Sequence, residues 1–122
     1  MAKKKLKPLL PSLREKKRYL AFEVLSKGKI TDFDAVSEAI LQNSTEFLGH
    51  LGMSKAGVMM LKDKYNKDSQ RGLIRVNHKN IDNLKAALTM IDKIDDQETI
   101  VKSIGVSGIL KKAEKRYLKI AS

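Results

Sequence analysis

The stretch Arg18-Tyr19-Leu20-Ala21-Phe22-Glu23-Val24-Leu25 decides the fold. Leu20, Phe22 and Val24 are large and apolar, and they alternate with residues that are smaller or more polar. Alternation with a period of two predicts a strand that has one face in an apolar core. The turn-forming segment 26–29, Ser-Lys-Gly-Lys, ends this strand.

A long amphipathic helix is predicted to follow the first strand. Thr31 or Asp32 is a suitable cap, because a short oxygen-bearing side chain can accept the free N–H groups of the first turn. The three-and-four spacing of apolar residues predicts one core-facing stripe. Gly52 is the predicted stop. The stripe consists of Phe33, Val36, Ile40, Phe47 and Leu51.

The second half of the chain repeats the alternation of strands and helices. Segment 57–61 is apolar at every position, which predicts a strand buried on both sides, and segment 73–77 is close enough to pair with it. A helix from Asn80, a turn at Asp95-Asp96, a strand over 99–104 and a helix capped by Ser107 follow. The helical stripes are Ile81, Leu84, Leu88 and Ile91, then Leu110, Ala113, Tyr117 and Ile120.

This order of elements predicts an α+β fold of the ferredoxin-like (RRM-like) class. Its four-stranded antiparallel sheet would carry helices on one face, with an extra C-terminal helix and the other sheet face open. Residues 1–12 are rich in lysine and proline and predict a flexible basic arm. Residues 13–122 would form a single RNA-binding domain.

The distribution of charge indicates a polyanionic partner. The 122 residues include 25 Lys+Arg and 14 Asp+Glu, which leaves a formal net charge of +11. Residues 1–30 hold ten basic and two acidic side chains, residues 31–100 nine and eleven, and residues 101–122 six and one. A slightly acidic body with two basic ends favours nucleic acid, although a lysine excess also serves solubility.

Composition argues against several other classes of protein. The chain has no cysteine, so thiolate metal sites, disulfides and thiol nucleophiles are excluded. Its longest apolar runs are about five residues, against the roughly 20 that a membrane-spanning helix needs. We therefore expect a cytoplasmic protein. His50 and His78 have no partners at metal-ligand or catalytic spacing, so we expect neither a catalytic residue nor a metal site in the chain.

Two basic segments are the candidate contacts for RNA phosphates. Arg14, Lys16, Lys17 and Arg18 lead into the first strand, and Lys111, Lys112, Lys115 and Arg116 lie along the last helix. Gly105, Ser107 and Gly108 precede that helix, where glycines either let a phosphate approach backbone N–H groups or serve only as a cap and turn. The open sheet face would show Arg75 and one aromatic residue, Tyr19. An RRM usually shows two or three aromatics, so Tyr19 is either a single stacking platform or a packing residue.

Three segments together resemble protein component 2 of archaeal ribonuclease P. Segment 11–19, Pro-Ser-Leu-Arg-Glu-Lys-Lys-Arg-Tyr, is similar to that family's entry to its first strand. Segment 105–113, Gly-Val-Ser-Gly-Ile-Leu-Lys-Lys-Ala, is similar to its C-terminal signature, and segment 71–76 to its third strand. The similarity extends from about Leu10 to Leu118. The Lys-rich first nine residues fall outside it, and relatives often have threonine where Ile109 stands.

The resemblance implies a subunit of the ribonucleoprotein that removes the 5′ leader of precursor tRNA. In that family the RNA holds the active site and binds the catalytic magnesium, so this chain would assist RNA folding and be inactive alone, with no cofactor of its own. The implied partners are ribonuclease P RNA, precursor tRNA through the complex, other ribonuclease P proteins, and protein component 3, which can form a heterotetramer with it. Two alternatives stay open from the residues alone: a general binder of structured RNA, such as a ribosome-associated protein or RNA chaperone, and a protein-interaction adaptor.

Overall fold

A computed structural model describes residues 16–118 of the chain. The basic arm predicted over residues 1–12, Arg14 and Ile120 lie outside these described residues. No helix within 16–118 has the length and apolarity needed to cross a membrane. The main elements are β1 (Lys17–Ser26), α1 (Phe33–Ala56), β2 (Met59–Met60), β3 (Arg71–Asn77), α2 (Ile81–Thr89), β4 (Lys93–Ile94), β5 (Gln97–Ser107) and α3 (Leu110–Ala113), which continues as a π-helical turn over Glu114–Leu118.

The strands form one antiparallel sheet in the order β2-β3-β1-β5-β4. The predicted α+β class with an antiparallel sheet is thereby confirmed, but the prediction of four strands is wrong. The fifth strand arises because Asp95 and Asp96, predicted to be a simple turn between a helix and a strand, form the loop of a β-hairpin. Both have left-handed backbones, with φ 55 and 64, the conformation of a tight two-residue hairpin. This hairpin pairs β4 with an extended start of β5.

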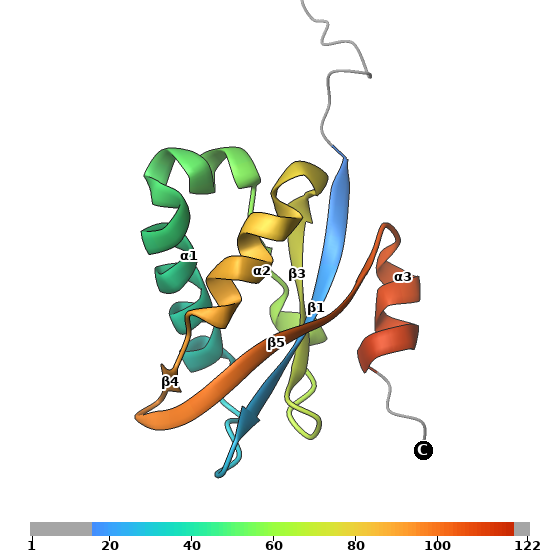
Figure 1. Ribbon diagram of the computed structural model, residues 1–122. Coiled ribbons are helices and arrows are strands. Elements are labelled where there is room, and N and C mark those ends of the chain that lie inside the picture. Colours follow the sequence, from blue (N-terminus) through green and yellow to red (C-terminus); the bar gives the residue numbers. More distant parts are fainter. Residues whose placement is uncertain (1–15, 119–122) are drawn as a thin grey trace, which may run out of the picture.

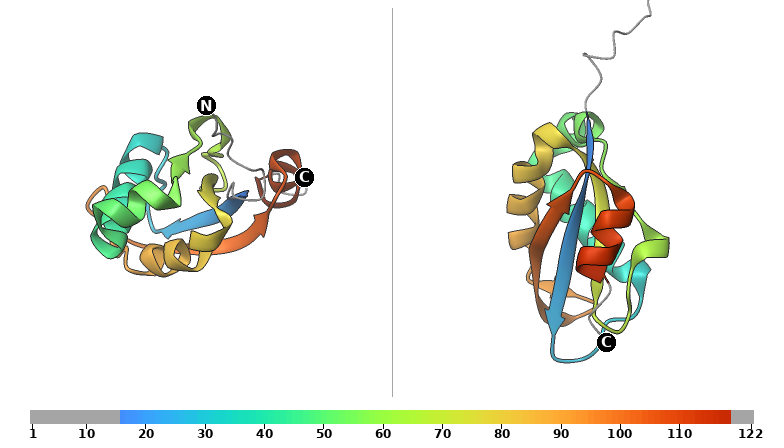
Figure 2. Two further views of the ribbon diagram at one scale, coloured as in Figure 1. Left: turned by 90° about the horizontal axis from the view of Figure 1, so that it is seen from above. Right: turned by 90° about the vertical axis from the view of Figure 1, so that its right-hand side faces the viewer.

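The helices lie on both faces of the sheet (Figure 1). Helices α1 and α2 pack side by side on one face. Helix α3 lies on the other face, where it contacts β1 and β5, and is drawn beside β1 in the right-hand view of Figure 2. The main core fills the space between α1, α2 and the sheet. Its buried members include the three alternating residues of β1 and several residues of both predicted helical stripes: Leu20, Phe22, Val24, Val36, Ile40, Leu84, Leu88 and Ile91.

The C-terminal part of α1 departs from the prediction. The helix does not stop at Gly52 but continues to Ala56, and Gly57, with φ 61, ends it by donating its N–H to the Met53 carbonyl. Gly49 interrupts the helix with φ 77 and ψ 167. This kink breaks the 3.6-residue periodicity on which the apolar stripe was based. Leu51, which follows the kink and was predicted to be buried, is therefore 69% exposed. Phe47, just before the kink, was also predicted to be buried and is 41% exposed.

The prediction of a strand over residues 57–61 that is buried on both sides is also wrong. Gly57 belongs to the end of α1, and only Met59 and Met60 form the short edge strand β2. An edge strand has one paired side and a less covered surface, so Met59 is 49% exposed. The pairing itself was predicted correctly, because β2 pairs with β3.

Tyr65 ties the β2–β3 connection to the main core, and this arrangement gives a pH-dependent prediction. Its hydroxyl donates to the Ile30 carbonyl at 2.8 Å, and burial raises its pKa from 10.0 to about 12. The unfolded chain releases this proton near pH 10, whereas the folded protein holds it to about pH 12. The contribution of the protonated Tyr65 phenol to the free energy of unfolding is therefore fully present below pH 10, and it is lost as the pH rises towards 12.

We expect Tyr65→Phe to lower the free energy of unfolding by about 1 kcal/mol at neutral pH. The variant should also lose less stability than the wild-type protein between pH 10 and 12. Urea titrations at pH 8, 10 and 11 on both proteins measure this difference. Parallel loss of stability in the two proteins would contradict the role assigned to the phenol proton.

Candidate nucleic-acid interface

Helix α3 covers part of the sheet face that was predicted to be open. A second apolar cluster forms beneath it from Ala21 on β1, Leu73 on β3, and Ala113 and Leu118 on the α3 segment. Ala21, Leu73 and Ala113 are completely buried. The C-terminal segment covers this face because its apolar side would otherwise have no partner, so the extra helix becomes a third layer of the fold.

Gly105 lies at the point of closest approach between β5 and the α3 segment. A Cβ at this position would overlap the ring of Tyr117, against its Cζ, Cε1 and hydroxyl oxygen. The strand is also irregular here, because the pairing of β1 with β5 shifts between Ala21 and Phe22. Packing against Tyr117 therefore requires glycine at position 105. This favours a structural role for Gly105 over a backbone contact with a phosphate.

Polar contacts from the β2–β3 side secure the end of the α3 segment. Arg71 Nη1 donates to the Tyr117 carbonyl at 3.1 Å, and Asn66 Nδ2 donates to the Leu118 carbonyl at 3.2 Å. Lys64 Nζ lies 3.0 Å from Glu114 Oε1. Arg71 also pairs with Glu23 at 3.4 Å. None of these anchoring residues was predicted, because no sequence pattern links positions that are about 50 residues apart.

The outer side of the α3 segment carries a set of exposed cations that we call the α3 basic face. Its only acidic neighbour on the segment, Glu114, pairs with Lys64 instead. Within residues 16–118 none of the four cations forms an ion pair. Three of them, Lys112, Lys115 and Arg116, line a hollow of about 230 Å³. The α3 basic face consists of Lys111, Lys112, Lys115 and Arg116, all exposed.

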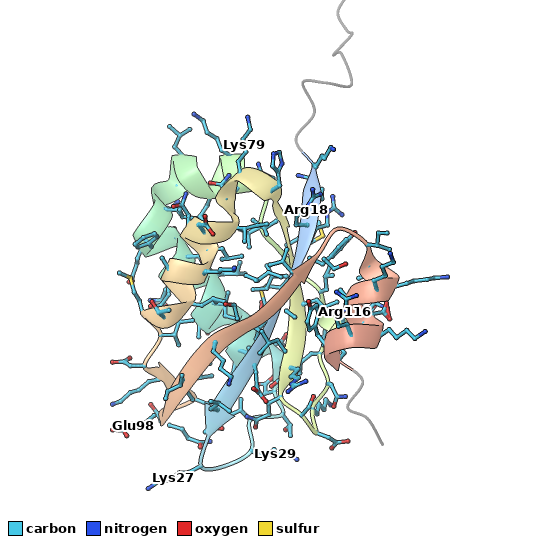
Figure 3. The ribbon with its side chains drawn as sticks, turned by 45° about the vertical axis from the view of Figure 1, so that its right-hand side comes forward. Arg18, Lys27, Lys29, Lys79, Glu98 and Arg116 are labelled. Carbon is cyan, nitrogen blue, oxygen red and sulfur yellow. The ribbon has the colours of Figure 1, made fainter. Side chains whose placement is uncertain are left out.

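The entry to β1 lies next to the turn that precedes α3. A Cβ on Gly108 would be 3.5 Å from Arg18 Nη1, which is an ordinary contact distance. Figure 3 shows Arg18 and Arg116 near the α3 side of the sheet, whereas Lys27 and Lys29 lie at the opposite end of β1 from Arg18. Lys16 and Lys17 are exposed beside Arg18. The structure thus places Arg18 beside the turn before α3, whereas Lys17 Nζ lies next to Gly57 at the end of α1.

The remaining predicted contacts lie on the three central strands. Tyr19 pairs with Arg75 on β3 and with Ser107 on β5, so the three residues form one row across the sheet. Tyr19 packs against the second apolar cluster, which favours a packing role. Ser107 belongs to β5 and does not cap α3 as predicted. Its Oγ accepts the Ile109 N–H at 3.2 Å, which closes the turn before the helix.

The two histidines are not part of the α3 basic face, and His78 borders the entry to β1. His50 is exposed on the kinked part of α1, and the exposed His78 has its backbone N–H on the Lys16 carbonyl at 2.8 Å. Over residues 16–118, no group of three or more acidic or histidine side chains is arranged to hold a metal ion. What this surface offers is cations and backbone, the groups that proteins use to contact phosphates.

A sequence model of the Rpp14/Pop5 family matches residues 18–118. The chain belongs to the Rpp14/Pop5 family. Ribonuclease P protein component 2 of Thermococcus kodakarensis is 34% identical over 116 residues, 95% of this chain and 94% of the relative. The protein of the same name from Methanosarcina acetivorans is 32% identical over 114 residues, 93% of this chain and 83% of the relative. The resemblance inferred from three short segments is confirmed.

The Rpp14/Pop5 match begins at Arg18 and ends at Leu118, so it includes both β1 and the α3 segment. A solved structure supports the same fold. A chain in a cryo-EM structure of yeast ribonuclease MRP has a TM-score of 0.59, with 14% identity over 86% of this chain and 87% of that chain. The complete architecture, including the helix on the second sheet face, therefore falls within the range of the family match.

Proposed function

We propose that this protein is a subunit of ribonuclease P, the ribonucleoprotein that cleaves the 5′ leader from precursor tRNA. The observation that carries the proposal is the family match, because relatives named ribonuclease P protein component 2 align over nearly their whole length. The cations of the α3 basic face, which form no ion pair within residues 16–118, support it independently. A subunit that contacts RNA needs such a surface, whatever its fold.

The proposed role is to assist folding of the catalytic RNA while the RNA performs the chemistry. Folding an RNA active site brings phosphates together, and their repulsion has to be screened by metal ions or by protein cations. The α3 basic face, with Arg18 beside it, would supply part of that screening. Magnesium would be bound by the RNA, and the isolated chain would not cleave precursor tRNA.

The proposed complex includes other proteins besides the RNA. The family resemblance implies protein component 3 as the direct partner, with two such pairs able to join as a heterotetramer. We place the complex in the cytoplasm, as expected from the composition of the chain. Phe47 and Leu51 on α1, 41% and 69% exposed, are apolar side chains available for a protein contact. They lie on the helical layer, so such a contact would leave the α3 basic face free for RNA.

Reconstituted cleavage of precursor tRNA tests the proposal. The matching catalytic RNA and component 3 are assayed at limiting magnesium with and without this chain. We expect the chain to raise the cleavage rate and to lower the magnesium concentration needed for half-maximal rate, because its cations replace part of the metal-ion screening. An unrelated basic protein of similar size and charge is the control. Equal stimulation by that protein, or none by this chain, would contradict the proposal.

A general binder of structured RNA is the second candidate function. It is favoured by the nature of the candidate contacts, because lysines and arginines recognise phosphates without reading sequence. The one aromatic in the row of central-strand residues, Tyr19, packs against the chain's own second cluster. Equal affinity for ribonuclease P RNA and for unrelated folded RNAs at physiological salt would favour this function over the first.

A further inference from the structure

We infer that Gly105 and Tyr117 are positioning residues that hold α3 against the sheet and thereby orient the α3 basic face towards RNA. The inference rests on the proposed function, because it takes RNA as the ligand. It assigns to Gly105 a role different from a backbone contact with phosphate. The cations that contact RNA would then be distinct from the residues that orient them, Gly105 on β5 and Tyr117 on the α3 segment.

A bulge in β5 shapes its contact with the α3 segment. The pairing shift places an additional residue on β5 between Ser103 and Gly105. Ile104 packs against the second cluster, and Gly105 meets the Tyr117 ring, so two consecutive residues face the α3 segment. A bulge produces this kind of local redirection of side chains. The bare backbone of Gly105 leaves room for the aromatic ring.

Two side chains fix the other end of the α3 segment. Arg71 and Asn66 donate to the carbonyls of Tyr117 and Leu118, at 3.1 and 3.2 Å. Free carbonyls at the end of a helix need donors, and here the sheet and the β2–β3 connection supply them. Tyr117 therefore has its ring against β5 and its backbone carbonyl bonded to Arg71 on β3. The two strands that flank β1 in the sheet, β3 and β5, therefore both restrain Tyr117.

The α3 segment is short. Four α-helical residues and one π-helical turn are too few to be stable in isolation, because helix formation has a costly nucleus. The direction of Lys112, Lys115 and Arg116 therefore depends on contacts with the sheet. Holding these side chains in place before binding reduces the entropy that association would otherwise lose.

The test is Gly105→Ala, which leaves every charge of the chain in place. The added methyl group should displace the Tyr117 ring, so hydrogen exchange at the Ala113 amide, which donates to the Ile109 carbonyl at 3.0 Å, should accelerate. We expect the affinity for the catalytic RNA to fall about tenfold, and the slope of affinity against salt to become shallower, because fewer phosphate contacts form together. Tyr117→Phe keeps the ring and is the matched control, with exchange and affinity close to wild type. Tyr117→Ala removes the ring without adding bulk, and should reproduce the loss if Gly105→Ala does not fold.

The outcomes separate this inference from the proposed function. Faster Ala113 exchange with unchanged RNA affinity and salt slope would overturn the inference, because α3 would then bind equally well without its anchor. Unchanged exchange in both Gly105→Ala and Tyr117→Ala would overturn it as well. Absence of RNA binding by the wild-type protein would instead refute the proposed function. A loss of affinity shared by the two variants and absent from Tyr117→Phe supports the inference.

Discussion

Replacing Lys112, Lys115 and Arg116 together by glutamate is expected to lower the affinity for ribonuclease P RNA by about a hundredfold at physiological salt. The three side chains line one hollow, are exposed, and form no ion pair within residues 16–118. Each lost phosphate contact should reduce the slope of log affinity against log salt by about 0.7 to 0.9. Filter binding or fluorescence anisotropy at four or five salt concentrations measures both quantities.

A charge-matched variant separates a local site from a general effect of net charge. Lys27, Lys29 and Lys93 are also exposed, and replacing them by glutamate changes the net charge by the same amount. Lys27 and Lys29 lie at the end of β1 that is remote from Arg18 (Figure 3). We expect this variant to lose only a few-fold in affinity and to keep the wild-type salt slope. Equal losses in the two variants would show that the α3 basic face is not the contact.

Phe22→Ala should lower the free energy of unfolding by about 3–5 kcal/mol. Phe22 is completely buried on the central strand β1, and its ring lies 6.4 Å from that of Tyr65 at an interplanar angle of 22°. A Cβ on Gly72 would be 2.7 Å from the Phe22 ring, so the neighbouring strand leaves space specifically for this side chain. Small domains have a total stability of about 5–15 kcal/mol. The substitution would therefore remove a large share of the stability, measurable by urea unfolding.

Phe22→Leu is the matched control, because it keeps an apolar side chain of intermediate size in the same space. Its expected cost is less than half that of the alanine variant, since the cavity left behind is smaller. Losses below about 1 kcal/mol for alanine would contradict the central place of Phe22 in the core. The α3 basic face lies on the other side of the sheet, so Phe22→Leu should bind RNA with nearly wild-type affinity.

Local patterns were sufficient for most of the secondary structure. The alternation around Phe22 predicted β1 and its buried face, and the stripe of Leu84 and Leu88 predicted α2, because periodicity reports directly on which side of an element is covered. The prediction failed where one backbone position changed the geometry. The kink at Gly49 and the left-handed Gly57 moved the end of α1, and the hairpin at Asp95 and Asp96 added a strand.

The candidate interface was predictable in its cations but not in its supports. Clustering of lysines and arginines at the two ends is visible in the sequence, and the structure brings Arg18 next to the turn before α3. The contacts of Arg71 and Asn66 with the last carbonyls of the segment join positions about 50 residues apart. Such pairs depend on strand order and register, which local sequence does not encode.

By itself, the sequence determined the α+β class, the central strand, the basic ends and the family, because periodicity, composition and short motifs are properties of neighbouring residues. Only the tertiary structure decided that α3 closes the second sheet face, and that Gly105 receives the Tyr117 ring. It also decided that Glu114 pairs with Lys64, so that the α3 basic face has no ion-pair partner among residues 16–118. These features arise when distant segments share one space, so their physical cause is packing and long-range pairing rather than local propensity.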